Sequence, residues 1–484
     1  MTRNNDSNIY RLITKAAALF GGAQVVGILC SVVRTKLIAI WLGSTGIGVI
    51  GLYNTAIETI TALTGLGIRS SSIREISEAK SSGNSQHLSQ IVTVVKRWSW
   101  FVGLLGAVVT ISLAPLLSRW TFGDDKHIWG FVLLSCTLLF NALLSGEQAI
   151  LQGTRQLRKL AKCSIYGAIA ALITTVPLYY FGGIDGIVPA LIIYVAVTYI
   201  VTLLYRDKEV PTIQLSVRQT AQRGKEMVIL GIFMTVSSFI TTLFSYIFSA
   251  YLNYKSGEST VGYYQAGFTL MNKYVGLIFT AMAMEYYPRL AGVSHNRALL
   301  SQYVGQQNEM MQLMLIPIIA LFIVLHPFMV RLLYTPEFYT INDYLLLAIQ
   351  GIPYKAISWS IGFVLLAKGD GKLYFITELL SDTITFALNI VGYEYWGLQG
   401  VGASYTIGFI LYLVIIYITC RRKYGIEPGS KSWRVTVITI LTTTILYIAY
   451  LFVPVLAWIL VGITVVISCF MLYRKWQGPA DNAQ

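Results

Sequence analysis

The chain of 484 residues has few charged residues, few cysteines and few histidines. Charged residues make up 12% of the sequence and hydrophobic residues 55%, which excludes an ordinary soluble protein, because soluble domains carry about 25% charged residues. The five cysteines form no CxxC pair and the four histidines are scattered. The sequence therefore indicates neither a disulfide framework nor a metal site.

Long apolar runs dominate the sequence. A hydrocarbon core of about 30 Å needs roughly 20 apolar residues per helix, and the runs here are about twice as long as a barrel strand needs. They therefore predict helices that cross a membrane. The expected spans are residues 16–41, 46–68, 98–119, 129–152, 163–181, 187–205, 227–251, 262–284, 310–333, 343–367, 373–393, 398–420, 434–453 and 455–473.

The basic residues lie almost entirely on one side of these spans. Numbered from a cytoplasmic N-terminus, the inner segments hold 28 of the 36 Lys and Arg residues and the outer segments hold four. This asymmetry predicts that both termini are cytoplasmic. The net charge of +14 is then mostly a consequence of topology rather than a sign of nucleic-acid binding, and it also suits an anionic lipid surface.

An internal repeat has a constant offset of 214 residues. The segment GIDGIVPA at 183–190 recurs as GLQGVGAS at 397–404, and Gly48 recurs as Gly262. The offset predicts a duplicated unit of six helices. Since six is even, both copies enter the membrane from the same side, which is the parallel duplication found in some transporters.

The expected fold is therefore an all-α integral membrane protein with 14 transmembrane helices. Two six-helix lobes, residues 1–210 and 211–425, are followed by two C-terminal helices in residues 426–484. The sequence suggests no role for these last two helices.

Glycine and aromatic motifs along the chain carry a resemblance to a known family. They are FGGAQVV (20–26), RTKLIAIWLG (34–43), GIG (46–48), GLG (65–67), SIRE (72–75), VGYYQ (261–265) and YPRLA (287–291). Together they resemble the Wzx-type O-antigen flippases. These belong to the polysaccharide transporter branch of the MOP superfamily, which also contains the MATE exporters. The motifs specify the family better than the substrate.

The resemblance implies two lobes around a central cavity, with the first, second, seventh and eighth helices at the lobe interface. It implies transport of an undecaprenyl-diphosphate-linked oligosaccharide, an O-antigen or related surface polysaccharide repeat unit, across the bacterial inner membrane. The cargo would move from the cytoplasmic to the periplasmic leaflet by alternating access, without catalysis or a bound cofactor. H⁺ or Na⁺ is a candidate coupling ion. A polysaccharide polymerase and glycosyltransferases are candidate partners.

Ionisable residues inside the spans are the best site candidates, because each costs about 2.5–3.5 kcal/mol at a helix centre on insertion scales. Lys273 and Lys355 lie near mid-depth, and we expect them to bind the diphosphate. Arg34 is preferred over Lys36 on the first helix, since a guanidinium makes bidentate phosphate contacts. The alternatives are snorkelling of Lys355 to an interface and a structural ion pair between Lys273 and Glu58.

Three arginines lie at the cytoplasmic ends of the second and eighth spans. Arg69 and Arg74 follow the second span and Arg289 follows the eighth. A basic cluster there suits capture of a diphosphate headgroup. The alternative is ordinary positive-inside charge.

Three carboxylates are candidates for ion coupling. Glu378 and Asp382 are four residues apart, so they share a helix face and together suit a proton or Na⁺. Glu58 lies close to the midplane of the second span. A structural ion pair, for example with Lys355, is the alternative for the first two carboxylates.

Other functions remain open. A MATE-like exporter of organic cations would need acidic groups to dominate the cavity, whereas two lysines lie at mid-membrane. A glycan polymerase or ligase would need a sizeable outer loop with catalytic groups, and the outer loops are short. A non-transporting scaffold for glycan assembly would have little need of buried charges.

Overall fold

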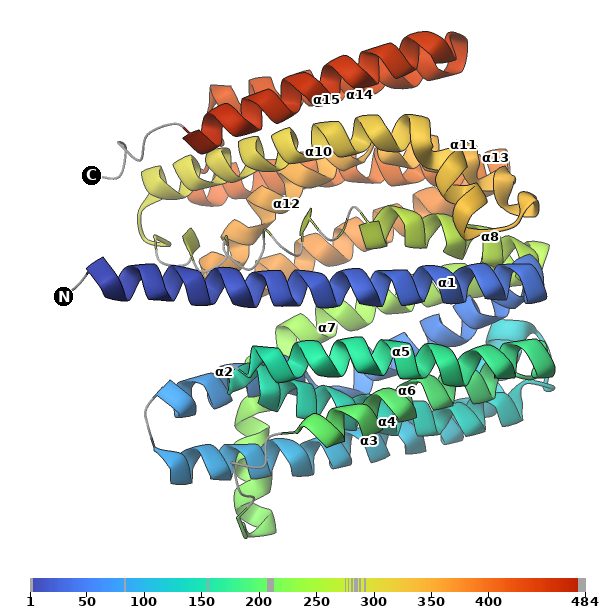
Figure 1. Cartoon of the computed structure of the whole chain (residues 1–484), viewed down its shortest axis with the longest axis vertical. Coiled ribbons are helices and arrows are strands. Elements are labelled where there is room, and N and C mark those ends of the chain that lie inside the picture. Colours follow the sequence, from blue (N-terminus) through green and yellow to red (C-terminus); the bar gives the residue numbers. More distant parts are fainter. Residues whose placement is uncertain are drawn as a thin grey trace. The chain divides into compact units, whose positions relative to one another are not determined.

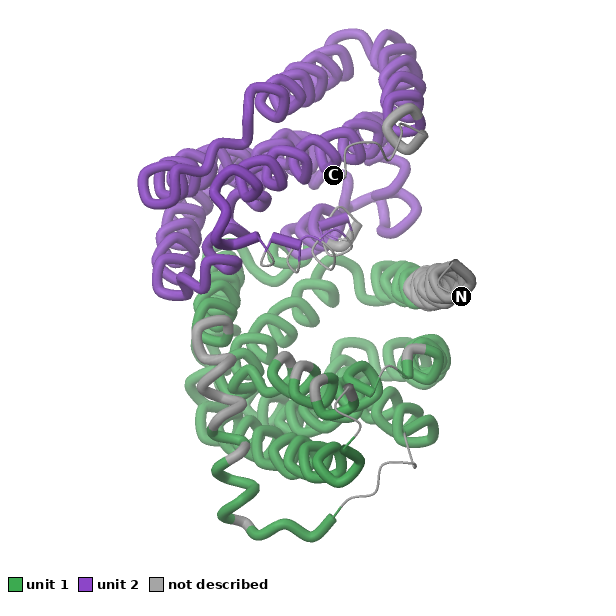
Figure 2. Tube along the Cα trace, turned by 90° about the vertical axis from the view of Figure 1, so that its left-hand side faces the viewer, with its two compact units in different colours: residues 1–262 green, residues 263–484 purple. Residues whose placement is uncertain are grey.

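The computed structural model describes residues 3–81, 84–154, 156–206, 213–274 and 293–477, and residues 276, 278–279, 282, 286 and 289–290. Every regular element among them is helical, which confirms the all-α prediction. The chain divides into two compact units, residues 1–262 and 263–484 (Figure 2). These units are defined by contacts within the structure and not by the sequence repeat. They therefore do not test the lobe boundaries expected at residues 210 and 425, which stay a prediction.

The described part of the first unit contains seven helices and the start of an eighth (Figure 1). They are α1 (Arg3–Thr64), α2 (Ile68–Ser81), α3 (Ser85–Phe122), α4 (Ile128–Gly153), α5 (Leu157–Gly182), α6 (Ile187–Tyr205), α7 (Val217–Ser256) and α8 (Glu258–Thr269).

The second unit contains the end of α8 and the following helices. They are η1 (Leu270–Tyr274), α10 (Arg297–Leu333), η2 (Pro336–Ile341), α11 (Asn342–Ile349), α12 (Ile352–Ala367), α13 (Gly371–Tyr424), α14 (Ser430–Phe452) and α15 (Pro454–Gln477).

Ten helices of the described chain are long and apolar enough to cross a membrane. Two of them, α1 and α13, each contain two expected spans joined at a bend. The bends lie at Gly43 (φ 62°) and Gly397 (φ 58°), where a left-handed backbone favours glycine. The expected span 343–367 corresponds instead to the shorter helices α11 and α12. The described start of the span 262–284 is helical and belongs to α8 and η1.

The helix boundaries repeat with the predicted offset of 214 residues. Helix α4 runs from Ile128 to Gly153, and the pair α11 and α12 runs from Asn342 to Ala367. The hairpin bends match as well, with Gly183 at φ 55°, ψ −134° and Gly397 at φ 58°, ψ −141°. The backbone conformation therefore repeats at the predicted offset, independently of side-chain similarity.

Equivalent positions of the two copies also touch each other where α1 meets α8 in the first unit. The hydroxyls of Thr45 and Ser259, 214 residues apart, are 2.9 Å apart. A Cβ added to Gly48 would collide with the Glu258 carbonyl and lie 3.1 Å from the Gly262 nitrogen. A Cβ on Gly262 would meet the Ser44 carbonyl, and the Gly48 nitrogen at 3.1 Å.

This contact is reciprocal. Gly48 meets Glu258, and their repeat equivalents Gly262 and Ser44 meet in the same way. A local two-fold axis therefore passes between α1 and α8, and only glycine lets the two backbones approach so closely. This close packing explains why the second glycine of the GIG motif at 46–48 has no side chain.

The second copy departs from the first at two helix irregularities. Helix α4 is continuous, whereas its counterpart breaks at Gln350 and Gly351 before α12. Pro353 is the local reason, since proline lacks the N–H that would bond to the preceding turn, and the first copy has Leu139 there. The second irregularity is the π-helix η1, which follows α8.

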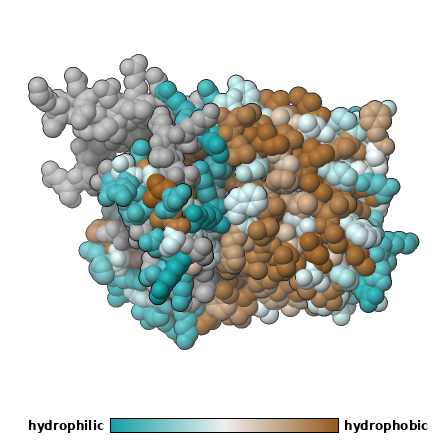
Figure 3. Space-filling view, turned by 90° about the horizontal axis from the view of Figure 1, so that it is seen from below, coloured by the Kyte–Doolittle hydropathy of each residue, from teal (hydrophilic) through white to brown (hydrophobic). Residues whose placement is uncertain are grey.

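The outer faces of the helices are apolar, as lipid contact requires. Along α3, Phe101, Leu104, Val108 and Ile111 share one face and are each about half exposed. Figure 3 shows this kind of surface as a broad hydrophobic area between two hydrophilic edges.

The two C-terminal helices α14 and α15 pack against α10. Buried amides contribute to the attachment of α14: the Asn308 Nδ2 donates to Ser432 Oγ and Thr436 Oγ1, both at 2.8 Å. The Gln312 Nε2 donates to the Pro353 carbonyl at 2.9 Å. A polar network within the bilayer region therefore links α14 to α10 and to the broken helix α12.

Candidate functional site

Lys355 lies in the first turn of α12, directly after the helix break. Its Nζ donates to the Tyr405 hydroxyl at 3.2 Å and to the Asn272 Oδ1 at 3.5 Å. The rings of Phe279, Tyr405 and Phe409 surround it, with centroids 5.3, 5.7 and 5.2 Å from Nζ. All of these residues belong to the second unit.

Neutral groups therefore hold this ammonium in place. Within the described residues no carboxylate forms an ion pair with Lys355, and aromatic faces supply part of its stabilisation through cation–π attraction. This side chain is half-buried, and no acidic side chain of the described residues is paired with it. Such an ammonium suits an anionic ligand.

Two of the three polar groups at this site, Asn272 and Lys355, lie at helix irregularities. Asn272 lies in the π-helix η1, and Lys355 follows the break at Gly351. π-helical turns are frequent at functional sites, and discontinuous helices build the substrate sites of many transporters. Pro353 within an apolar run is a sequence signal for this break, and the expected span 343–367 did not take it into account. The π-helix had no comparable signal.

The repeat places a polar pair at the same positions in the first unit. Subtracting 214 relates Asn272 to Glu58 of α1 and Lys355 to Asn141 of α4. One copy therefore carries a carboxylate and an amide, and the other an amide and an ammonium. The ion pair between Lys273 and Glu58, which the sequence left open, stays untested because the side chain of Lys273 lies outside the described residues.

Glu58 has an exposed side chain although its neighbours Ile57 and Thr59 are buried. It shares a helical face with Thr61 and Ala62, three and four residues further along α1. Both of these line a cavity of about 420 Å³ within the first unit.

Glu378 and Asp382 lie one turn apart on α13, and both are half-buried. The Tyr412 hydroxyl donates to Glu378 Oε1 at 2.5 Å, from the part of α13 that follows the bend at Gly397. The ion pair with Lys355 that the sequence left open for this pair is not observed, because Lys355 bonds to Asn272 and Tyr405.

Two of the remaining predicted cations contact aromatic rings. The Arg34 guanidinium lies over the ring of Tyr194 in α6, 4.5 Å from its centroid. Arg289 lies 5.2 Å from the Tyr303 centroid and donates to the Gln307 Oε1 at 3.2 Å.

Arg69 and Arg289 each line a cavity of their own unit. Arg69 borders the 420 Å³ cavity of the first unit. Arg289 borders a cavity of about 660 Å³ in the second, beside the Glu309–Lys431 ion pair at 3.3 Å. The side chain of Arg74 lies outside the described residues.

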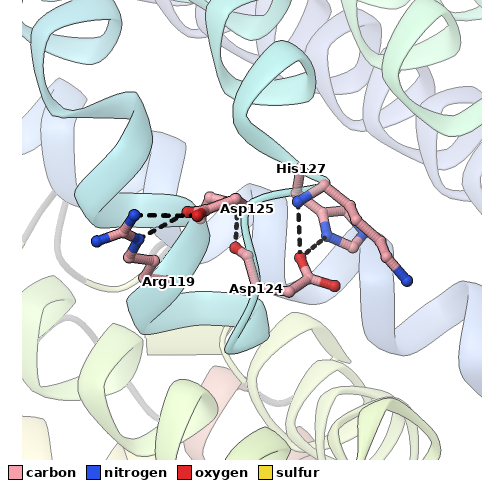
Figure 4. A network of polar contacts seen from close by, with 6 residues as sticks. Arg119, Asp124, Asp125 and His127 are labelled. Atoms are coloured by element: carbon pink, nitrogen blue, oxygen red, sulfur yellow. Dashed lines mark hydrogen bonds and ion pairs between the residues drawn. The ribbon is translucent and has the colours of Figure 1, made fainter.

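Charged residues in the turn between α3 and α4 form a network that was not predicted from the sequence (Figure 4). Arg119 binds both carboxylate oxygens of Asp125, at 2.7 and 3.0 Å. The His127 ring bonds to Asp124 at 3.0 Å, which holds the pKa of that carboxyl below its usual range. His127 also stacks on Phe122 at 3.8 Å, so this network fixes a turn rather than forming a ligand site.

The sequence model of the family described as polysaccharide biosynthesis protein matches residues 38–342. The chain belongs to this family. It is 20% identical over 428 residues to proteins named lipid III flippase from Escherichia coli K12 and Shigella flexneri, covering 85% of this chain and 99% of each relative. The alignment with the two flippases therefore spans both copies of the repeat.

Solved structures of two transporter groups share the fold of this family member. The lipid II flippase MurJ in an inward closed conformation has a TM-score of 0.70 at 14% identity, covering 95% of this chain and 99% of MurJ. An inward-facing MATE family transporter of the MOP superfamily has a TM-score of 0.66 at 14% identity, covering 82% and 94%. The predicted MOP-like fold is confirmed.

Named relatives of this polysaccharide biosynthesis protein are flippases, and its structural neighbours include flippases and transporters. This agrees with the expectation that the chain is a membrane transporter and not an enzyme.

Proposed function

We propose that this protein is a flippase for a polyprenyl-diphosphate-linked oligosaccharide, the repeat unit of an O-antigen or a related surface polysaccharide. It moves this lipid from the cytoplasmic to the periplasmic leaflet of the bacterial inner membrane, with both termini in the cytoplasm. Family membership, the named flippase relatives and the MOP-like fold support the proposal.

The single observation that carries the substrate assignment is the environment of Lys355. A diphosphate brings at least two negative charges into a region of low dielectric, where fixed cations lower its free energy. Lys355 provides a cation held by aromatic rings and neutral hydrogen-bond partners. An exporter of organic cations would need a carboxylate at this place.

Arg34 and Lys273 are further proposed ligands of the diphosphate, and Arg74 and Arg289 are proposed to attract it at the cytoplasmic ends of the helices. Glu378 and Asp382 are the proposed coupling pair for H⁺ or Na⁺, with Glu58 as the next candidate. A polysaccharide polymerase and glycosyltransferases are the proposed partners, because they consume and supply a lipid-linked glycan.

A MATE-like exporter is the second candidate, favoured by the fold likeness to a MATE transporter. Equilibrium binding distinguishes the two functions. The purified chain in nanodiscs is titrated with a labelled undecaprenyl-diphosphate disaccharide and with tetraphenylphosphonium as a lipophilic cation. We expect saturable binding of the glycolipid alone. Saturable binding of the cation alone would establish the exporter.

A further inference from the structure

The first unit contains a partly open cavity of about 420 Å³, and its lining includes Asn141, the repeat equivalent of Lys355. A volume of this size lies within the range of ligand pockets. The end of α1, the start of α2 and segments of α3, α4 and α7 surround it. Its polar side chains are Thr61, Thr64, Arg69, Ser72, Ser99, Asn141, Ser145, Thr235 and Ser238.

Helix α2 begins at this cavity. Gly67, Ile68 and Arg69 line it, and they belong to the turn and first residues of a 14-residue helix. The first N–H groups of a helix have no acceptor within the helix, and together with the helix dipole they favour an anion. In α2 the Ile68 N–H donates to the Gly65 carbonyl at 3.2 Å, so the donors meant here are the N–H groups that follow it in the first turn. The first turn of α2 contains no acidic residue that would neutralise this end.

A buried hydroxyl gives an independent sign of a missing ligand. Ser72 is 0% exposed and lines the cavity, and its Oγ has no hydrogen-bond partner among the residues that the structure describes. Buried polar atoms in native proteins nearly always have a partner, so this one indicates a group that the cavity receives.

The backbone at the cavity edge is strained as well. Leu66 has φ 51° and the next residue, Gly67, has φ 65°. A left-handed conformation is costly for leucine, and such strain clusters at ligand-binding sites. The Gly65-Leu66-Gly67 turn thereby directs the start of α2 at the cavity.

The lining has a single charge among the described residues, the guanidinium of Arg69, and no carboxylate. A guanidinium, a helix N-terminus and a serine hydroxyl are together the donors that bind phosphate in proteins. We infer that this cavity is a binding site for a phosphoryl group, held by Arg69, Ser72 and the first turn of α2.

Two sources carry this chemistry, the diphosphate of a lipid-linked glycan and the phosphate of an anionic phospholipid. The first source rests on the proposed function, and the site would then be its cytoplasmic entry point. Asn141 and Ser145 of α4 line the same cavity and are placed for the hydroxyls of an attached sugar.

The test measures binding of undecaprenyl diphosphate, phosphatidylglycerol and inorganic phosphate to the full chain in detergent micelles. The variants are Arg69→Gln, Arg69→Lys and Ser72→Ala. The matched control is Lys80→Gln, at the exposed far end of the same helix. We expect Arg69→Gln to weaken undecaprenyl diphosphate binding at least about tenfold and Ser72→Ala a few-fold, because hydrogen bonds to charged groups are the strong ones. Arg69→Lys falls between wild type and Arg69→Gln, and Lys80→Gln matches wild type.

If Arg69→Gln, Ser72→Ala and Lys80→Gln all bind each of the three probes as tightly as wild type does, the inference is overturned. The proposed flippase function would then be untouched. If wild type binds phosphatidylglycerol or inorganic phosphate through Arg69 but does not bind undecaprenyl diphosphate, the phosphoryl site stands and the proposed function fails. Arg69 is exposed, so its variants are expected to fold, and thermal melting of each purified variant checks this.

Discussion

At Lys355, one ammonium is kept near the middle of an apolar span by a phenol, an amide oxygen and three aromatic rings. Truncation of this side chain removes a charge without leaving a buried carboxylate unpaired, so we expect the fold to tolerate it. The residue is therefore suited to a test of function separate from stability.

We expect Lys355→Ala to lower glycolipid transport at least about tenfold, because a charge-assisted contact to phosphate is lost. Lys355→Arg keeps the charge and should retain part of the activity. Lys372→Ala, an exposed cation at the start of α13, is the control and should transport normally. Transport is compared at equal amounts of inserted protein. Wild-type transport by Lys355→Ala would remove Lys355 from the substrate site.

The carboxylate pair of α13 makes a different prediction. A coupling ion shifts the equilibrium between the inward-open and outward-open states only by the difference between its binding free energies for these two states. Glu378→Gln with Asp382→Asn preserves the shape of both side chains and removes their charge. We expect the double variant to bind the glycolipid normally but to lose the dependence of transport on a proton or sodium gradient. An unchanged gradient response in reconstituted vesicles would leave Glu58 as the next candidate.

At the scale of helices, the duplication brings Gly48 and Gly262 against each other across α1 and α8. Neither position has space for a side chain, since a Cβ would meet a backbone carbonyl of the other helix. Overpacking of a tight contact costs about 1–3 kcal/mol, so a larger residue should separate the two helices.

We expect Gly48→Val to suppress formation of a disulfide between cysteines placed at Thr45 and Ser259, whose hydroxyls are 2.9 Å apart. The measurement is the crosslinked fraction after mild oxidation, in a background without the five native cysteines. Gly27→Val is the control, because a Cβ at Gly27 meets nothing within 4 Å. Equal crosslinking in both variants would show that the α1–α8 contact does not depend on Gly48.

Sequence reasoning located the spans because hydrophobic length is a local property of the chain. It also identified the repeat, since the glycines at 183 and 397 and at 48 and 262 are required by backbone conformation or close approach. The polar contacts were harder to predict. The contact of Lys355 with Asn272 joins residues 83 apart, and it depends on a π-helix that periodicity does not encode.

For the whole molecule, the charge asymmetry and the even repeat predict one topology. Single cysteines at Gln156, Ser216 and Gly429 should react with reagents only from the cytoplasmic side. Cysteines at Asp124, Gly257 and Thr340 should react only from the outer side. Positions 216 and 257 flank α7, which is long and apolar enough to cross a membrane once. Labelling of both from one side would contradict the duplicated six-helix arrangement.

The most direct test of the flippase function is movement of the lipid itself. Purified protein is reconstituted into vesicles that contain a fluorescent undecaprenyl-diphosphate oligosaccharide in both leaflets, and a membrane-impermeant quencher is then added. Protein-free vesicles should lose only the outer half of the signal. Vesicles with the wild-type chain should lose nearly all of it, and vesicles with Lys355→Ala should lose it at least about tenfold more slowly. Quenching that stops at one half with the wild-type chain, under proton and sodium gradients of either direction, would contradict a flippase.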